Sequence, residues 1–269
     1  MSTIPPEDID TQGHAGLLIG SQWSPPGDPT WVAVIAHGYG EHIGRYQWVA
    51  ERLTADGAVV YGHDHVGHGR SEGERVLIED FERVVDDLHL LVQRAHVEHP
   101  DLPLVLIGHS MGGMIAARYT QRHPETLTAT VLSGPVLGSW EPTALADLDE
   151  IPPTPIDITT LSREPDVGRA YEADELVWHG DFKRPTLLAL RACLEAITRG
   201  GRLTVPTIWL HGADDQLVPI ERSDEGWAHI APDGAPSKRY PGARHEIFNE
   251  TNREEVLDDV LAFVHEHIG

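Results

Sequence analysis

The chain has 269 residues, of which 40% are hydrophobic. This allows one sizeable core with an insertion but not several independent domains. Its 20 Lys and Arg residues against 43 Asp and Glu residues give a formal net charge of −23. That charge argues against binding to nucleic acid and against electrostatic docking on anionic membranes, and it favours a neutral or zwitterionic small-molecule substrate. The acidic composition fits salt adaptation and general solubility equally well.

The amino terminus, Met1 to Asp8, has neither a basic start nor an apolar run. We therefore expect no secretory signal and a cytoplasmic location. The strongest apolar runs, around 31–36 and 102–107, have the length of strands and are too short for a transmembrane segment. The single cysteine, Cys193, excludes an intramolecular disulfide and is best interpreted as a buried structural thiol. The oligomeric state stays open.

Short stretches rich in Val, Ile and Leu predict strands that are buried on both faces. They lie at 31–36, 58–62, 103–108, 127–133 and 205–211, and a further short candidate lies at 238–240. Apolar residues three or four positions apart predict helices with one buried face at 80–99 and 251–267. This alternation indicates an α/β fold in which helices cover both faces of a mostly parallel sheet.

The alternation of strands and helices breaks between about Pro135 and Val205, where prolines interrupt short apolar segments. We interpret this stretch as a short cap that is inserted into the core. The predicted division is therefore a first part of the core at 1–136, a cap at 137–203 and a second part of the core at 204–269. The sequence shows no internal repeat.

The stretch Gly108-His109-Ser110-Met111-Gly112 follows an apolar strand and precedes a helical run. This strand-turn-helix context is typical of a nucleophile elbow, in which a strained turn exposes the serine hydroxyl above the edge of the sheet. Ser110 is therefore the predicted nucleophile. The alternative is a chance match of the same pattern in a structural loop.

A serine nucleophile needs a histidine base that a carboxylate orients, and in this fold the order along the chain is Ser, acid, His. The loop after the strand at 205–211 contains Asp214 and Asp215. We predict Asp215 as the acid and interpret Asp214 as a turn or capping residue, although the pair keeps both assignments open. His245, in the loop after 238–240, is the predicted base.

Two backbone amides are expected to stabilise the negative charge that develops on the substrate's carbonyl oxygen. Met111, the residue after the nucleophile, supplies the first. The second is Tyr39, because the strand at 31–36 ends in His37-Gly38-Tyr39-Gly40. A simple glycine turn is the alternative interpretation of that segment.

The histidine-rich stretch 62–71 could be mistaken for a metal site, since three imidazoles and a carboxylate lie close together in it. Its glycines and its position after a strand fit a tight loop held by Asp64 and Arg70 better. No separate ligand cluster completes a coordination set, so we predict no metal site.

The stretch His37-Gly38-Tyr39-Gly40-Glu41-His42-Ile43-Gly44-Arg45-Tyr46 resembles the oxyanion segment of the monoacylglycerol lipase family, and the resemblance continues at 62–71, 108–112, 161–165 and 245–250. It implies an α/β-hydrolase fold and hydrolysis of monoacylglycerol to fatty acid and glycerol without a cofactor. It also implies that Glu41 and Arg45 build a polar pocket for glycerol, towards which the cap residue Tyr171 reaches. An exposed surface ion pair is the alternative for Glu41 and Arg45.

The chain departs from the family in its cap, which is short, acidic and rich in proline around 147–155. We therefore expect a shorter or more open acyl tunnel, and transient contact of the cap with a lipid surface stays open. The same residues also fit a lysophospholipase or a general carboxylesterase, because the cap decides which ester enters. A non-catalytic ligand-binding protein on a hydrolase scaffold is the alternative from another class.

Overall fold

A computed structural model of the chain describes residues 5–269. Within them, one sheet has the strand order β1-β2-β4-β3-β5-β6-β7-β8. The strands are β1 (Glu7–Gly13), β2 (Gly16–Trp23), β3 (Trp31–Ala36), β4 (Ala58–His63), β5 (Leu104–His109), β6 (Ala129–Ser133), β7 (Thr207–Gly212) and β8 (Ser237–Tyr240). All neighbours from β4 to β8 pair in parallel. The prediction of a mostly parallel sheet is confirmed.

The sequence does not predict β1 and β2, which form an antiparallel pair at the edge of the sheet. In β1 only Ile9 is buried, and in β2 buried residues alternate with partly exposed ones. Neither strand therefore contains the continuous apolar run that marks the buried strands. This pattern is expected towards the edge of a sheet, where strands are covered less completely than at its centre.

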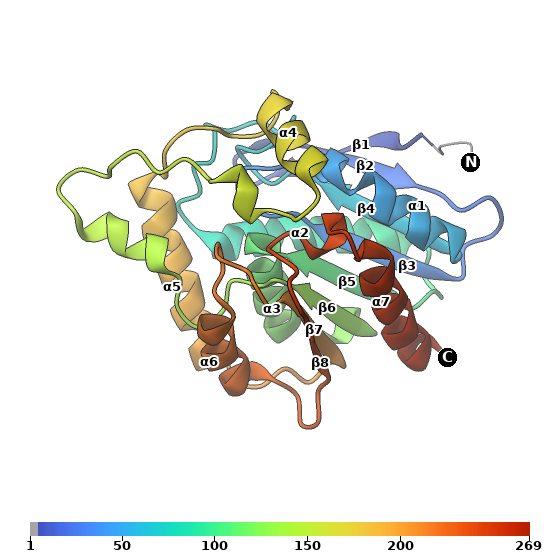
Figure 1. Cartoon of the computed structure of the whole chain (residues 1–269). Coiled ribbons are helices and arrows are strands. Elements are labelled where there is room, and N and C mark those ends of the chain that lie inside the picture. Colours follow the sequence, from blue (N-terminus) through green and yellow to red (C-terminus); the bar gives the residue numbers. More distant parts are fainter. Residues whose placement is uncertain (1–4) are drawn as a thin grey trace.

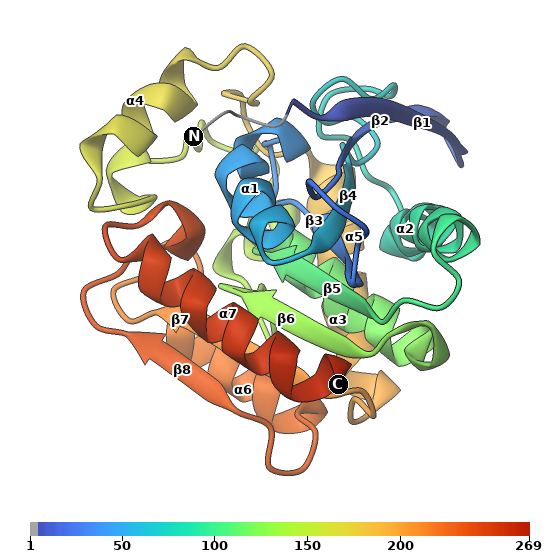
Figure 2. The same cartoon turned by 90° about the vertical axis from the view of Figure 1, so that its right-hand side faces the viewer.

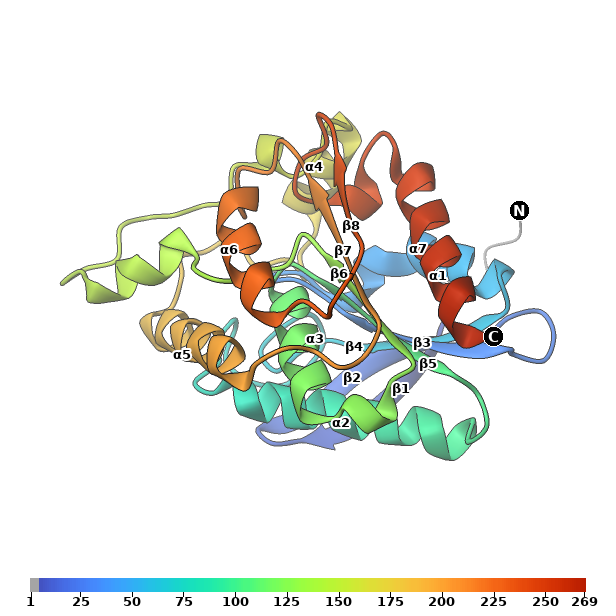
Figure 3. The ribbon, with the colours of Figure 1, turned by 90° about the horizontal axis from the view of Figure 1, so that it is seen from below.

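The sheet lies between two layers of helices, as Figures 2 and 3 show. α1 and α7 cover one face, and α2, α3, α5 and α6 cover the other, each layer with its own apolar cluster. The helices are α1 (Gln47–Ala55), α2 (Phe81–Glu98), α3 (Met111–Arg122), α4 (Pro165–Ala173), α5 (Arg184–Gly200), α6 (Ile220–Ile230) and α7 (Arg253–Ile268). The carboxylate of Asp80 caps α2 by accepting from the amide of Glu82, which explains where that predicted helix begins.

The chain between β6 and β7 forms no strand, and α4 lies at the top of the molecule in Figure 1. α5 behaves differently, because Leu190, Leu194 and Ile197 belong to the apolar cluster that α3 shares with the sheet. The predicted cap boundaries, 137–203, stay a prediction, because α5 packs both on α3 and on the 3-10 helix η3 (Glu141–Asp147) within the predicted cap. Cys193 of α5 is buried, and burial raises the pKa of its thiol to about 12.

Among the helices of residues 5–269, none is both long and apolar enough to cross a membrane. The prediction that Met1 to Asp8 carries no secretory signal concerns a segment whose first four residues lie outside the described part. That prediction is therefore not tested by the fold.

Candidate active site

Ser110 lies on the tight turn between β5 and α3, with backbone angles φ 57° and ψ −119°. Positive φ is unfavourable for a residue with a side chain, so the turn needs support from its surroundings. The amide of Ser110 donates to the carbonyl of Ser133 (2.9 Å), and its own carbonyl accepts from Val136 (3.1 Å). These bonds to the end of β6 and to the loop after it hold the strained turn in place.

The glycines on either side of Ser110 are required by close backbone contacts. A Cβ atom at Gly108 would lie 2.3 Å from the carbonyl oxygen of Gly112, and one at Gly112 would lie 2.0 Å from that of Ala36. Neither neighbour is a flexible side chain that could give way. The turn therefore sits directly against the end of β3, and a Cβ atom at Gly38 would lie 3.2 Å from Cβ of Ser110.

His245, in the loop after β8, lies between Ser110 and Asp215. Its Nε2 is 2.9 Å from Oγ of Ser110, and its Nδ1 donates to Oδ2 of Asp215 at 2.7 Å. The other oxygen of Asp215 accepts from the amides of Leu217 and Val218, both at 2.9 Å. Of the two candidate acids, Asp215 is thus the one that contacts His245, whereas Asp214 is exposed.

The charges of Asp215 and His245 stabilise each other. Burial alone would lower the pKa of His245, but the charge of Asp215 and the hydrogen bond to it outweigh burial and raise the pKa. Burial alone would raise the pKa of Asp215, but His245 and His211 bring it well below its usual range. Asp215 therefore stays ionised and can stabilise a protonated His245.

The sequence did not single out His211, the last histidine before the acid loop. Its Nδ1 accepts from Nε1 of Trp209 (3.0 Å), so the proton is on Nε2, which faces the carbonyl of Val218 (2.9 Å) and Oδ2 of Asp215 (3.1 Å). His211 thus gives the Asp215 carboxylate another donor. Its position four residues before the predicted acid Asp215 could have indicated this contact.

His109 is a second buried histidine beside the nucleophile, with its ring centroid 4.8 Å from that of His245. Burial, and then the proximity of His245, lower the pKa of His109 to about 4. Its Nδ1 bonds the carbonyl and hydroxyl oxygens of Ser133 at 3.1 and 3.0 Å. His109 is therefore neutral near pH 7, and its neutrality keeps a further positive charge away from His245.

The two predicted oxyanion residues, Tyr39 and Met111, both line the cavity that contains Ser110. Met111 is the first residue of α3, where amides have no partner within the helix. Tyr39 lies in the turn after β3, next to Gly38, which approaches Ser110 closely. The roles of the two amides as donors to a substrate oxygen stay a prediction.

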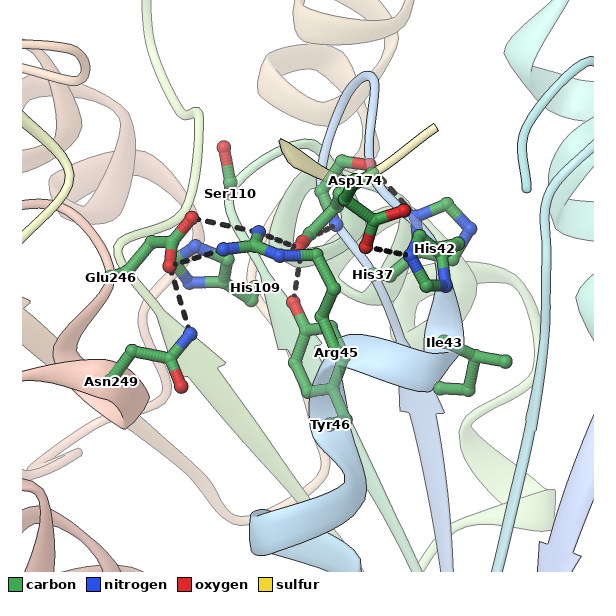
Figure 4. Close-up of polar contacts among 12 residues, drawn as sticks. His37, His42, Ile43, Arg45, Tyr46, His109, Ser110, Asp174, Glu246 and Asn249 are labelled. Atoms are coloured by element: carbon green, nitrogen blue, oxygen red, sulfur yellow. Dashed lines mark hydrogen bonds and ion pairs between the residues drawn. The ribbon is translucent and has the colours of Figure 1, made fainter. Parts of the chain in front are cut away.

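Glu41 and Arg45 belong to a buried cluster of charges that also contains Glu246. Arg45 donates to Glu41 (2.5 Å) and, with both terminal nitrogens, to the two carboxylate oxygens of Glu246 (2.8 Å each), as Figure 4 shows for Glu246. The other oxygen of Glu41 accepts from the amide of Gly38 (2.6 Å) and the hydroxyl of Tyr46 (2.7 Å). The Arg45 side chain is 10% exposed and both glutamates are 6% exposed, which excludes a surface ion pair.

Burial would raise the pKa of Glu41, but Arg45 and the hydrogen bonds lower it overall. In the sequence, Glu246 stands out only within the segment 245–250 that resembles the family. Its position next to the predicted base His245 could have identified it as a residue of the site. Tyr171 contacts the same cluster, since its ring centroid lies 5.0 Å from Cζ of Arg45. The structure therefore brings the three predicted pocket residues, Glu41, Arg45 and Tyr171, together.

The cavity above Ser110 has a volume of about 740 Å³. The charged cluster and Tyr171 form one part of its lining, and the hydroxyls of Tyr39 and Tyr171 have no hydrogen-bond partner among the described residues. The remaining lining is mostly apolar and includes Val136, Trp140, Leu145, Ile156, Phe182, Leu190 and Leu217. The cap contributes several of these side chains, so it supplies apolar cover in spite of its acidic composition.

The cap is bonded to the segment that carries Tyr39. Nε2 of His42 lies 2.8 Å from Oδ2 of Asp174, a contact visible in Figure 4. In addition, the amide of Trp178 donates to the carbonyl of Gly40 at 2.7 Å. The turn after β3 is thus held from below by Glu41 and from above by the cap.

In the histidine-rich stretch, the rings of His63, His65 and His68 are buried and pack against one another. The Asp64 carboxylate accepts from the amides of Ile43 (2.7 Å) and Arg70 (2.8 Å), so it organises the loop as a structural residue does. Across residues 5–269, no group of three or more His, Cys, Asp or Glu side chains is arranged to hold a metal ion.

Comparison with known proteins matches residues 27–252 to the family described as serine aminopeptidase, S33. The chain is 40% identical to a monoacylglycerol lipase of Mycolicibacterium smegmatis, over 91% of this chain and 92% of the relative. It is 30% identical to a phospholipase of Bacillus subtilis, over 89% of this chain and 97% of the relative.

Among solved structures, the monoacylglycerol lipase of Paleococcus ferrophilus superposes with a TM-score of 0.81 at 26% identity, over 93% of this chain and 99% of that one. The family match spans residues 27–252 and so includes strands of the sheet as well as the predicted cap at 137–203. The chain is an enzyme of the α/β-hydrolase superfamily and belongs to the monoacylglycerol lipase family.

Proposed function

We propose that this protein hydrolyses the ester bond of monoacylglycerols to give a fatty acid and glycerol. The observation that carries the proposal is the lining of the cavity at Ser110, which combines a buried charged cluster with mostly apolar walls. An acyl chain fits the apolar walls, and a small neutral polyol fits the cluster and the unpartnered hydroxyls of Tyr39 and Tyr171. A volume of about 740 Å³ is suited to one acyl chain with a small headgroup.

In the proposed mechanism, neutral His245 takes the proton of Ser110 as Oγ attacks the ester carbonyl. The amides of Tyr39 and Met111 stabilise the oxyanion, and ionised Asp215 stabilises the protonated His245. His245 then protonates the departing glycerol oxygen, which leaves an acyl-enzyme on Ser110. A water molecule that His245 deprotonates attacks this ester and releases the fatty acid. This mechanism requires neither a metal ion nor an organic cofactor.

The test is a comparison of purified protein on monoacyl-, diacyl- and triacylglycerols and on a zwitterionic lysophospholipid, all with the same acyl chain. We expect the highest kcat/KM on monoacylglycerol, because the charged cluster faces a small polar group. Equal rates on triacylglycerol would contradict a pocket for glycerol. Preference for the lysophospholipid would instead support the lysophospholipase alternative, which the relative in Bacillus subtilis favours.

The raised pKa of His245 predicts how activity depends on pH. Since the base must be neutral to accept the proton of Ser110, kcat/KM should fall about tenfold per pH unit below that pKa. The pKa lies above the ordinary histidine value of about 6.5, so activity is lost at a higher pH than an unperturbed histidine would give. Initial rates on a neutral ester between pH 5 and pH 9, with a readout independent of pH, measure this. Full activity at pH 5.5 would be inconsistent with it.

The non-catalytic alternative predicts binding without turnover. A stoichiometric burst on a chromogenic ester with no steady state would support that alternative, whereas sustained turnover that a serine-directed phosphonate blocks would eliminate it.

We further propose that the enzyme is cytoplasmic and contacts lipid surfaces transiently through the cap region. Exposed Leu148 and Leu188, both 46% exposed, are apolar side chains that such contact would cover.

A further inference from the structure

The charged cluster beside Ser110 carries more negative than positive charge. It contains two carboxylates, Glu41 and Glu246, and one guanidinium, Arg45, so its formal charge is −1 when all three are ionised. All three side chains are at least nine-tenths buried. Water therefore screens this excess charge far less than it screens the exposed charges of the surface.

Both terminal nitrogens of Arg45 are bound to carboxylates of the cluster. One terminal nitrogen serves both Glu41 and Glu246, and the other serves Glu246. The amide nitrogen of Asn249 donates to Oε2 of Glu246 at 2.8 Å and thereby fixes the carboxylate, as Figure 4 shows. An arginine beside a nucleophile is otherwise well suited to bind phosphate, through the same paired donors that Glu246 occupies here.

The cluster lies where the leaving group of an ester must sit. His245 has to protonate the departing oxygen, and Glu246 is the next residue in the chain. On the other side, Glu41 bonds the amide of Gly38, which approaches Ser110 closely. A leaving group between the base and the oxyanion turn therefore faces the carboxylates of the cluster.

From this geometry we propose that Glu246 determines leaving-group specificity: it occupies the paired terminal nitrogens of Arg45 and gives the cluster its negative charge, so that acyl esters with a phosphate-bearing leaving group are rejected and neutral polyol esters are accepted. This inference rests on the proposed monoacylglycerol hydrolysis. The catalytic triad alone does not discriminate between a neutral and an anionic headgroup. The charge of Glu246 supplies a physical reason for such discrimination.

The test compares monoacylglycerol with lysophosphatidic acid of the same acyl chain, dispersed in the same neutral detergent. For the unaltered protein, we expect kcat/KM on monoacylglycerol to exceed that on lysophosphatidic acid by about tenfold or more. Glu246→Gln keeps the shape of the side chain but removes its charge, and it leaves one side of Arg45 less strongly bound. We expect this variant to lower the preference for the neutral ester by about tenfold, through a gain on the phosphate ester.

Two control variants separate this role from other effects. Glu141→Gln removes an exposed carboxylate that also lines the cavity, and we expect it to leave the preference unchanged. Glu246→Asp retains the charge and should retain most of the preference. An equal change in Glu141→Gln would mean that a carboxylate anywhere in the cavity lining has this effect, without contact with Arg45, and would overturn the inference. An unchanged preference in folded Glu246→Gln would overturn it as well.

The inference is also tested without any variant, because a preference well below tenfold in the unaltered protein contradicts it whether or not Glu246→Gln folds. Failure of the proposed function has a different signature. It appears in the unaltered protein as a rate on monoacylglycerol no higher than that on triacylglycerol. The specificity role of Glu246 fails only in the comparison between neutral and phosphate-bearing esters.

Discussion

Replacing Ser110 with alanine should reduce ester hydrolysis by about 10⁴-fold or more, to the level that binding and the oxyanion amides alone sustain. The reason is that Oγ of Ser110 is the only atom of that side chain that can form the acyl-enzyme, and it lies 2.9 Å from Nε2 of His245. The measurement is kcat/KM on a monoacylglycerol and on a chromogenic ester, together with covalent labelling by a phosphonate, which should disappear.

The Ser110→Ala protein should remain folded, since the substitution removes one oxygen and leaves the bonds of the turn's backbone intact. A thermal unfolding midpoint close to that of the unaltered protein checks this. Retention of more than a tenth of the hydrolytic rate by a folded variant would show that another residue is the nucleophile.

Replacing Asp215 with asparagine should lower kcat by roughly 10³- to 10⁴-fold, although the two side chains have nearly the same shape. An amide nitrogen facing Nδ1 of His245 would favour the wrong tautomer, and the charge that stabilises protonated His245 would be lost. The matched control is Asp214→Asn in the neighbouring position, where the side chain is exposed. We expect that control to keep kcat within about threefold, because the charge there is screened by water.

The pair of variants also decides between the two acids that the sequence left open. A larger loss in Asp214→Asn than in Asp215→Asn would reverse the assignment. Steady-state kinetics on a neutral ester, with the concentration of folded protein taken from ultraviolet absorbance, gives the two values on a common scale.

The buried strands and the order of Ser110, Asp215 and His245 could be predicted because each leaves a local mark. A strand covered on both faces is a continuous apolar run, and the elbow needs glycines at fixed positions around its serine. β1 and β2 leave no such mark, since exposed or partly exposed residues interrupt the buried ones along both strands. The packing of α5 against both α3 and η3 could not be predicted for a related reason, because its position in the chain says nothing about which elements it contacts.

The contacts within the charged cluster could not be predicted from the sequence for a different reason. Glu41 and Arg45 were singled out through resemblance to a family, but their main partner, Glu246, lies 201 positions after Arg45. No periodicity or spacing connects residues so far apart, and the contact exists only because the loops after β3 and β8 meet above the sheet. The same holds for the bonds of the cap to His42 and Gly40.

Those last contacts couple entry of substrate to readiness for reaction. The amide of Trp178 donates to the carbonyl of Gly40, and Gly40 follows Tyr39, whose amide is assigned to the oxyanion. A cap that lifts to admit or release a lipid would break this bond, and the turn would keep the bond from the amide of Gly38 to Glu41 and the contact of its carbonyl with the ring of His37. An open molecule would then lack one of the bonds that fix the oxyanion turn, and we expect it to be a poorer catalyst than the closed molecule even with its three reacting side chains in place.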